Sequence, residues 1–218
     1  MMILERDKER GGPVIALIDY GMGNLRSVEK AFTACGVNPT ITSDPKVVSR
    51  ADKIILPGVG AFSHAMRELR ARKLLSPIRE KILSGTPYLG ICLGLQLLFS
   101  ESEEGGRLKG MGIIPGPVVK FRGDLKVPHM GWNNISIRQK KNPLLKGILA
   151  NTYFYFVHSY YGVPEDREWV LTSTHYGKSF CSSVSRGHVF ATQFHPEKSQ
   201  REGLKIIKNF IDYRADSR

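Results

Sequence analysis

Cys92 is the residue in this sequence best placed to act as a nucleophile. It lies between Gly90 and Gly94, where an apolar segment of strand character, 88–91, gives way to an apolar segment of helical character, 93–100. The pattern Gly-x-Cys-x-Gly is the cysteine form of the nucleophile elbow, a turn so tight that only small residues fit beside the nucleophile. We expect this turn to hold the thiol out into solvent. A small buried core cysteine is the alternative, because free cysteines are commonly buried.

The first turn of a helix is a favourable place for a reactive thiol. Unpaired N–H groups and the positive end of the helix dipole lie there, and both favour the thiolate form of Cys92. A thiolate attacks carbonyl carbon, so the expected chemistry is acyl transfer. The N–H of Leu93 is then expected to serve as one oxyanion donor.

A base for this nucleophile is found in the segment Gln193-Phe194-His195-Pro196-Glu197. We expect His195 to end a strand and Glu197 to emerge on the same side, where its carboxylate holds the imidazole in one tautomer. A surface turn is the alternative for His-Pro-Glu taken alone. Beside an elbow cysteine a catalytic pair is favoured, because strand carboxyl ends collect at one edge of a parallel sheet, where active sites form.

Two further features are suited to the same site. Gly58, Val59 and Gly60 follow a strand pattern, and their backbone N–H groups are expected to supply a second oxyanion donor. Glycines on both sides of Val59 would let that peptide flip, whereas a plain turn is the alternative. Gln96 lies one helical turn beyond Cys92, where an amide suits recognition of an amide or amino-acid substrate; a capping hydrogen bond is the other interpretation.

The elements that must position these residues alternate along the first hundred residues. Helical patterns follow Leu25, cover 61–73, and cover 77–83 with Ser76 as N-cap. Strand patterns occupy 14–19, 37–42, 53–56 and 88–91. This alternation predicts an α/β fold with a mostly parallel central sheet and flanking helices. The turn Gly21-Met22-Gly23 invites a dinucleotide-binding interpretation, but Arg26 occupies the sixth position of that fingerprint, so a structural turn is favoured.

The second half of the chain has a different pattern. Short strands separated by Gly, Pro and Asn predict an antiparallel extension of the sheet, at 118–121, 134–137, 153–158, 169–174, 180–185 and 188–194. Leu204, Ile207, Phe210 and Ile211 predict a closing amphipathic helix. We expect one domain over residues 14–218, preceded by a flexible leader over residues 1–13.

Composition excludes several classes of protein. The 218 residues are 41% hydrophobic and 24% charged, and no apolar run approaches the roughly 20 residues that span a bilayer. Residues 5–10 carry mixed charges, so we expect no signal or transit peptide and a cytoplasmic protein. The three cysteines form no C-x-x-C pair, which favours reduced thiols over a zinc or redox site. The formal charge of +12 is scattered, which favours a basic surface or an acidic protein partner over nucleic acid.

These residues resemble those of a known family. The elbow Gly90-Ile91-Cys92-Leu93-Gly94-Leu95-Gln96, followed by His195-Pro196-Glu197, resembles the class I glutamine amidotransferases over residues 14 to about 213. Further segments are similar to one branch, the glutaminase subunits of imidazole glycerol phosphate synthase in histidine biosynthesis. They are Ile18-Asp19-Tyr20-Gly21-Met22-Gly23-Asn24-Leu25, Leu56-Pro57-Gly58-Val59-Gly60-Ala61-Phe62, Pro128-His129-Met130-Gly131-Trp132-Asn133 and Tyr155-Phe156-Val157-His158-Ser159-Tyr160.

The resemblance implies a class I glutamine amidotransferase-like fold with a flavodoxin-like core and no cofactor or metal. It implies that Cys92 attacks the side-chain amide of glutamine, that His195 protonates departing ammonia and then activates water, and that Glu197 orients His195. It also implies that Gly58, Val59 and Gly60 form a mobile oxyanion strand. The implied substrate pocket is formed by Gln96, His158, Ser159 and Tyr160.

A partner is also implied by the resemblance. Ammonia would pass to a (β/α)8-barrel cyclase subunit of a heterodimer, which makes imidazole glycerol phosphate and AICAR. Trp132, Asn133, Tyr155 and Lys198 match positions that face this subunit. The residues themselves give weaker support, since large aromatic residues in turn-rich segments are typical of interfaces, and core packing would account for some of them. No nucleic acid or membrane partner is expected.

Two other interpretations differ in kind. One is a catalytically silent interaction module that keeps the fold as a scaffold, and the complete set of Cys92, His195 and Glu197 argues against it. The other is the glutaminase component of a different amidotransferase, such as that for anthranilate or pyridoxal phosphate. The synthase that co-purifies with the chain would distinguish these enzymes.

Overall fold

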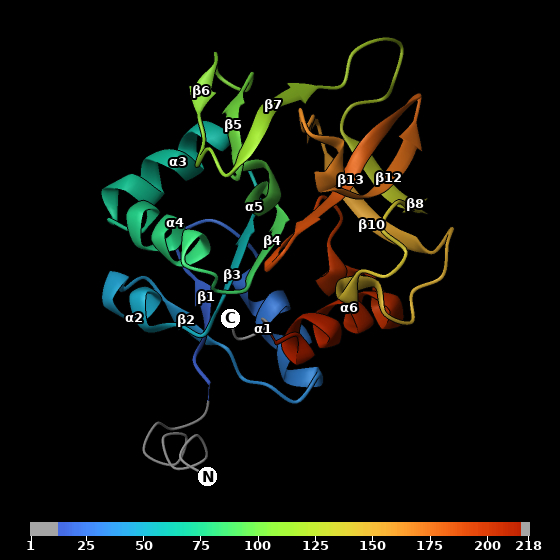
Figure 1. The fold of residues 1–218 in the computed structure, drawn as a ribbon. Helices are drawn as coiled ribbons and strands as arrows, with labels where there is room; N and C mark the ends of the chain where they lie inside the picture. The colour runs from blue at the N-terminus through green and yellow to red at the C-terminus, as the bar shows by residue number, and fades with distance from the viewer. Residues whose placement is uncertain (1–12, 215–218) are drawn as a thin grey trace.

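An eight-stranded mixed sheet forms the centre of the molecule, which the computed structural model describes over residues 13–214 (Figure 1). The predicted leader over residues 1–13 lies outside the described residues except for Pro13. Five neighbouring strands are mutually parallel, in the order β2-β1-β3-β4-β14. This is the strand order of a flavodoxin-like core, as expected. The five strands are β1 (Ile15–Ile18), β2 (Thr40–Thr42), β3 (Lys53–Gly58), β4 (Tyr88–Cys92) and β14 (Val189–Thr192).

The antiparallel extension is confirmed, with one difference. The sheet continues from β14 through β13 (Lys178–Arg186), β12 (Val170–Tyr176) and β9 (Ser136–Ile137). The segment predicted at 188–194 as part of an antiparallel hairpin is β14, which also pairs in parallel with β4. It therefore belongs to the parallel core and brings the end of the chain beside the elbow.

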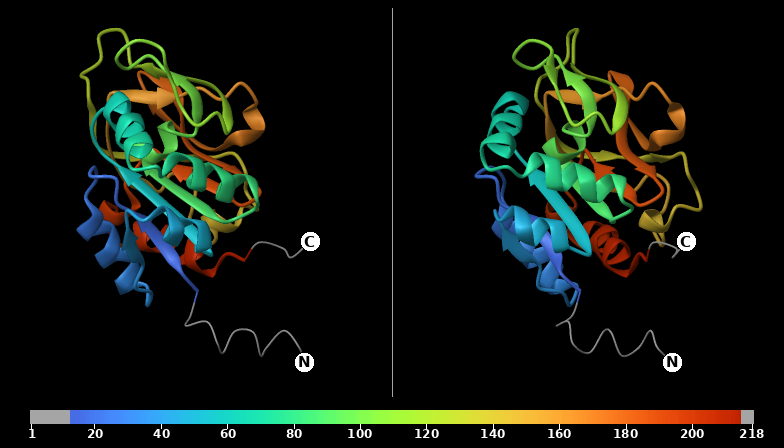
Figure 2. Two further views of the ribbon diagram at one scale, coloured as in Figure 1. Left: turned by 90° about the vertical axis from the view of Figure 1, so that its left-hand side faces the viewer. Right: turned by 60° about the vertical axis from the view of Figure 1, so that its left-hand side comes forward.

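Two smaller sheets lie beyond the carboxyl ends of β3 and β4 (Figures 1 and 2). One pairs β8 (His129–Asn134) with β10 (Tyr153–His158). The other has four strands in the order β11-β7-β5-β6, which are β5 (Phe99–Ser102), β6 (Leu108–Lys109), β7 (Ile114–Lys120) and β11 (Tyr160–Gly162). Together they place side chains over the edge of the central sheet where an active site is expected.

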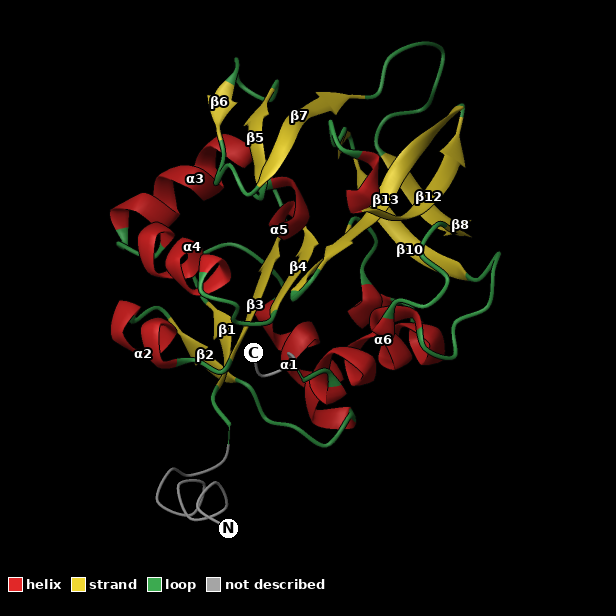
Figure 3. Ribbon diagram, viewed as in Figure 1, coloured by secondary structure: helices red, strands yellow, loops and turns green. Residues whose placement is uncertain are grey.

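Helices cover both faces of the central sheet (Figure 3). One group packs together as α2 (Pro45–Arg50), α3 (Phe62–Ala71) and α4 (Leu75–Leu83). The other consists of α1 (Leu25–Ala34) and α6 (Gln200–Asp212), with α5 (Leu93–Gln96) at the elbow and short 3-10 turns at η1 (Pro143–Leu145), η2 (Arg167–Trp169) and η3 (Pro196–Lys198). Among residues 13–214, no helix has both the length and the apolar character needed to cross a membrane.

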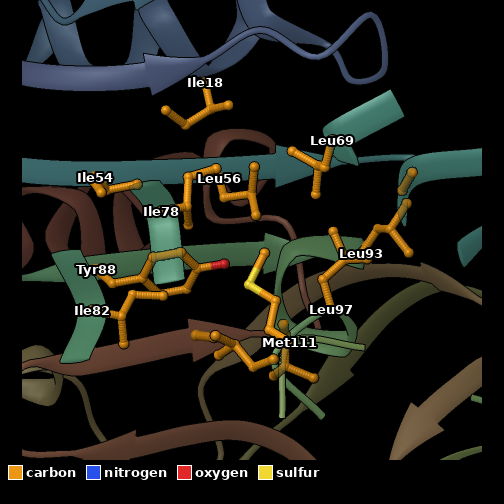
Figure 4. Packing of buried hydrophobic residues seen from close by; sticks show 14 of the residues in the cluster. Ile18, Ile54, Leu56, Leu69, Ile78, Ile82, Tyr88, Leu93, Leu97 and Met111 are labelled. Carbon is orange, nitrogen blue, oxygen red and sulfur yellow. The ribbon is translucent and has the colours of Figure 1, made fainter. Parts of the chain in front are cut away.

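Alternating strand residues divide the core between these two helical layers. On β3, Ile54 and Leu56 join one buried cluster while Ile55 joins the other, because successive side chains of a strand point to opposite faces. Figure 4 shows Ile54 and Leu56 packed with residues of α3 and α4, namely Leu69, Ile78 and Ile82. Both faces of β1, β3, β4 and β14 are therefore buried, whereas the edge strand β2 exposes Thr40 and Ile41.

Two helix predictions need correction. The helix predicted from Pro77 begins at Leu75, so Ser76 is not its N-cap; Leu74 occupies that position, fully buried, and Pro77 still falls in the first turn, where its missing N–H costs nothing. The helix predicted over 93–100 ends at Gln96, because Phe99–Ser102 instead pairs with β7 as β5. The α2 helix, capped by the Asp44 side chain, was not predicted.

Candidate active site

Cys92 occupies the tight strand-to-helix turn that the sequence predicts. Its backbone has φ 54° and ψ −103°, a conformation that non-glycine residues rarely adopt. The flanking glycines are required by close approach: a Cβ on Gly94 would lie 1.8 Å from the carbonyl oxygen of Leu56, and one on Gly90 would lie 2.6 Å from that of Gly94. The strained conformation is held by packing on both sides, as is typical of functional turns.

The Cys92 thiol is not held out into solvent, contrary to the expectation from the elbow. The residue is only 6% exposed and borders a pocket of about 590 Å³. Its Sγ donates to the carbonyl oxygen of Val157 at 3.9 Å and accepts from Nε2 of Gln193 at 3.5 Å. Strand β10, some 65 residues away in the sequence, covers the thiol, so a reactant must enter the pocket to reach it.

His195 and Glu197 form a buried pair behind this thiol. Nδ1 of His195 lies 2.7 Å from Oε1 of Glu197, and both side chains are only 2% exposed. The backbone of His195 is also fixed: its N–H donates to the Tyr155 carbonyl at 2.9 Å, and its carbonyl accepts from the Ser199 hydroxyl at 2.6 Å. The prediction that His195 ends a strand is wrong. Strand β14 ends at Thr192, and His195 lies three residues beyond it.

The electrostatics of His195 are set by Cys92 and Glu197. Burial, the largest single influence, lowers the pKa of His195, but the charge of the nearby Cys92, followed by the hydrogen bond and charge of Glu197, raises it to about 10. Since Nδ1 is taken by Glu197, Nε2 is the nitrogen free to exchange a proton with a group at Cys92; it is buried and has no hydrogen-bond partner among the described residues. The three side chains can therefore supply a nucleophile, a base and its orienting carboxylate.

The glycine-rich segment is not a plain turn, because its first residues continue the sheet. Gly58 pairs with Cys92 at the end of the parallel ladder between β3 and β4. Because Pro57 has no N–H, this register directs the Gly58 carbonyl to the N–H of Leu93. The expected oxyanion donor Leu93 is thus engaged, while Val59, 39% exposed, and Gly60 line the pocket beside it.

Gln96 links the two walls of the pocket instead of capping a helix. Its Nε2 donates to the Tyr160 carbonyl at 2.9 Å and to Oε1 of Gln193 at 3.2 Å. Both donor hydrogens are therefore used, and the carbonyl oxygen of Gln96 remains as an acceptor for a ligand. The predicted pocket residues His158, Ser159 and Tyr160 line the same space.

Gln193 is a site residue that the sequence reasoning missed. It is completely buried, and Gln96 orients its amide so that Nε2 faces the sulfur of Cys92. The available signal was an amide at the end of a strand that is otherwise apolar or small, two residues before His195. A donor to a charged acceptor is worth more than one to a neutral acceptor, so this contact is placed to stabilise negative charge on the sulfur.

Replacing Gln193 is expected to slow the reaction of the thiol without unfolding the protein. Gln193→Leu removes the donor, and the alkylation rate of Cys92 by iodoacetamide at pH 7 should fall about fivefold to tenfold, the worth of one hydrogen bond. Gln193→Glu places a carboxylate against the sulfur and should slow alkylation further. An unchanged rate in both variants would show that the contact has no influence on the thiol.

A chain of hydrogen bonds runs from Asn133 to the pocket wall through two buried histidines. Nδ1 of His158 lies 2.8 Å from the Tyr160 carbonyl and must donate to it, so Nε2 of His158 accepts from Nδ1 of His129 at 3.0 Å. Nε2 of His129 then accepts from the Asn133 amide at 3.2 Å. Burial lowers the pKa of His129 to about 4, and burial with smaller effects of its neighbours lowers the pKa of His158 to about 3.

This histidine pair predicts loss of stability in acid. Because both folded-state pKa values lie below the unfolded value of about 6.5, the unfolded chain takes up protons first, and stability falls as the pH drops from about 6.5 toward 4. Chemical unfolding of the wild type and of His129→Asn at pH 7.5 and 5 measures this. Between the two pH values the free energy of unfolding should fall less for the variant than for the wild type. The reason is that the variant lacks one of the groups that take up a proton on unfolding.

The residues expected at an interface divide between two sides of the β8–β10 ribbon. Trp132, 47% exposed, and Tyr155 are paired across it, with their rings 6.2 Å apart, and the Lys198 ammonium lies 5.8 Å from the Tyr155 ring. Met130 and Tyr153 are 63% and 57% exposed and extend this patch, which we call the aromatic face. Asn133 lies on the opposite side, with its amide bonded inward to His129 and to the His175 carbonyl.

Comparison with known proteins agrees with this fold. A family model described as "Glutamine amidotransferase class-I" matches residues 16–213. Solved structures with this fold include one described as a glutamine amidotransferase, with TM-score 0.72 and 17% identity over 91% of this chain and 97% of that one. A structure of PurLQS from Thermotoga maritima gives TM-score 0.72 and 20% identity over 93% and 99% of the two chains. The chain belongs to the class I glutamine amidotransferase family.

Relatives that are similar over nearly the whole chain share one name, imidazole glycerol phosphate synthase subunit HisH. The chain is 55% identical over 206 residues to that protein from Syntrophotalea carbinolica. The aligned region covers 91% of this chain and 100% of the relative. Identity is 52% to that from Moorella thermoacetica, over 90% and 93% of the two chains. It is 51% to that from Aquifex aeolicus, over 89% and 94%. Within its class, this enzyme is thus of the HisH type.

Proposed function

We propose that this chain is the glutaminase subunit of imidazole glycerol phosphate synthase and hydrolyses glutamine to glutamate and ammonia through Cys92, His195 and Glu197. The observation that carries the proposal is the 2.7 Å pair of His195 and Glu197 buried behind the elbow cysteine, at the base of a pocket. A catalytically silent scaffold has no need of a buried ion pair, which costs desolvation energy, beside a strained cysteine.

In the proposed reaction the Cys92 thiolate attacks the side-chain carbonyl carbon of glutamine. The C=O electron pair moves onto oxygen, and the tetrahedral intermediate then expels nitrogen, which takes a proton from Nε2 of His195 and leaves as ammonia. The now neutral His195 removes a proton from water, whose oxygen attacks the thioester. Collapse of the second intermediate breaks the C–S bond, releases glutamate and restores the thiolate and imidazolium. Glu197 holds Nδ1 of His195 throughout.

The pocket supports an amino-acid substrate. The free carbonyl oxygen of Gln96 is suited to the ammonium group of glutamine, since the two amide hydrogens of Gln96 are already used. Backbone groups of His158, Ser159 and Tyr160 complete this side of the pocket. The side chain of a bound glutamine would then extend toward Cys92.

The oxyanion site requires a rearrangement. With the Gly58 carbonyl directed to the N–H of Leu93, a developing oxyanion would meet a carbonyl oxygen instead of a donor. We propose that the peptide between Gly58 and Val59 flips, so that the N–H of Val59 joins that of Leu93 in stabilising the oxyanion. Low glutaminase activity of the isolated chain follows from this resting geometry.

The partner we propose is a (β/α)8-barrel cyclase subunit, docked on the aromatic face. Met130, Trp132 and Tyr153 are exposed side chains of the kind enriched in interfaces, and Val157 of the same ribbon lines the pocket. Because the ribbon that carries the aromatic face also lines the pocket, ammonia released at Cys92 would pass directly to the docked cyclase subunit. The cyclase would use it to make imidazole glycerol phosphate and AICAR. The three thiols are all free, which suits the proposed cytoplasmic location.

Glutamine turnover with and without the cyclase subunit tests the proposal. Glutamate formation should be slow for the isolated chain and rise by about 100-fold or more in the complex, the worth of an oxyanion donor. Equal turnover in the two states contradicts the closed resting site. Co-purification with an anthranilate or pyridoxal phosphate synthase, in place of the cyclase, would assign the chain to another amidotransferase.

A further inference from the structure

Tyr20 carries a buried hydroxyl that the mechanism above does not use. The residue lies two positions beyond the end of β1 and is completely buried, and its hydroxyl has no hydrogen-bond partner among the described protein groups. Leaving a buried donor unpaired is costly, so such groups are rare in folded proteins. The neighbouring buried Tyr88 shows the usual arrangement, since its hydroxyl donates to the Gly94 carbonyl at 2.8 Å.

The hydroxyl lies directly against the oxyanion segment. A Cβ built on Gly58 would meet the Tyr20 hydroxyl at 2.2 Å and Cβ of Leu93 at 2.9 Å. The oxygen of Tyr20 therefore occupies the space where any other residue at position 58 would place its side chain. Burial, and after it the charge of Cys92, raises the pKa of Tyr20, so the hydroxyl stays protonated and remains a donor.

A flip of the Gly58–Val59 peptide would leave the Gly58 carbonyl in need of a new donor. In the resting state its partner is the N–H of Leu93, which the flip releases for the oxyanion. The peptide turns about the bonds on its two sides, Cα–C of Gly58 and N–Cα of Val59, so its carbonyl stays beside the Gly58 α-carbon. The one unpaired donor identified against that carbon among the described residues is the Tyr20 hydroxyl. The flipped state thus leaves the Gly58 carbonyl without a donor, and the resting state leaves the Tyr20 hydroxyl without an acceptor. These two groups lie next to each other.

We propose that Tyr20 is a positioning residue whose hydroxyl donates to the Gly58 carbonyl when the oxyanion segment flips into its active conformation. The inference rests on the proposed glutaminase function and adds a residue to it. Tyr20 does not touch the reacting atoms; it offsets the loss of the ladder hydrogen bond and so raises the population of the flipped state. Its unpaired hydroxyl destabilises the resting state and is satisfied only when the site is competent.

This assignment predicts that stability and activity respond differently in Tyr20→Phe. The substitution deletes a hydroxyl that has no partner in the resting state, so the midpoint of thermal unfolding should be unchanged or slightly higher. In the complex with the cyclase subunit, kcat for glutamine hydrolysis should fall about tenfold, the worth of one hydrogen bond, while KM stays the same. The alkylation rate of Cys92 by iodoacetamide should also stay the same, because that reaction uses no oxyanion donor.

Thr174→Val is the matched control, because Thr174 also has a buried hydroxyl without a partner among the described residues and lies on β12, outside the pocket. Its kcat should equal that of the wild type. A wild-type kcat in Tyr20→Phe overturns the inference, as does a clear loss of thermal stability, which would mean that the hydroxyl is bonded in the resting state. Cys92→Ser in the same assay separates the two proposals: if wild-type turnover is absent or survives this change, the glutaminase function itself fails.

Discussion

Replacement of Cys92 with serine is expected to reduce glutamine hydrolysis by at least about 10⁴-fold, in the isolated chain and in the complex. The reason lies in the protonation state of His195. Its pKa is raised to about 10 by its surroundings, so near neutral pH the ring is an imidazolium suited to face a thiolate. A serine hydroxyl does not ionise under these conditions, and replacing the sulfur also removes the largest influence that raises the pKa of His195, so the charged pair on which the reaction depends is lost.

Two measurements make this result specific. The first is glutamate formation by Cys92→Ser compared with that by Cys181→Ser. The Cys181 thiol is also buried, and burial raises its pKa to about 12. Cys181 lies outside the pocket, so its variant should keep wild-type turnover. The second is synthase activity of the Cys92→Ser complex with ammonium salt in place of glutamine. Activity should persist, because only the source of ammonia is lost; residual glutamine hydrolysis near the wild-type rate would rule out the thiol mechanism.

The sequence predicted the elements around the elbow because their signals are local. The glycines beside Cys92 report a close approach of strand and helix, and the structure has that contact between Gly94 and Leu56. His195 and Glu197 were found for the same reason, since two residues of one segment make the 2.7 Å pair. Alternation of strands and helices over the first hundred residues likewise indicated the parallel core.

The features that could not be predicted depend on contacts between distant segments. The burial of Cys92 arises from Val157 on β10, which nothing near position 92 reveals. Gln193 faces the sulfur only because β14 inserts beside β4, a pairing across about a hundred residues. The importance of Tyr20 lies in its hydroxyl, which is unpaired and lies against Gly58 at the end of another strand. In each case the sequence states which side chain is present, but it does not state which residue that side chain contacts in the fold.

Gly94→Ala is expected to destabilise the protein by about 3 kcal/mol and to abolish most of its activity, although alanine is the better helix former. Helix propensity favours alanine over glycine by up to about 1 kcal/mol. The new methyl group, however, would lie 1.8 Å from the backbone carbonyl oxygen of Leu56, which no side-chain rotation relieves. The helix α5 must then move away from β3, and overpacking of this kind costs up to about 3 kcal/mol.

The matched control is Gly36→Ala, which separates steric overlap from backbone conformation. Gly36 has φ +87° and no atom within 4 Å of the position that an alanine Cβ would take, so its alanine variant should lose only the 1–2 kcal/mol or so of a left-handed residue and keep full activity. Urea unfolding gives both stabilities, and glutamate formation in the complex gives the activities. Since a displacement of about 1 Å at a reacting group costs roughly 100-fold in rate, Gly94→Ala should lose activity even where it folds. Wild-type stability and turnover in Gly94→Ala would mean that strand and helix are not held in contact, and the strained thiol of Cys92 would then need another cause.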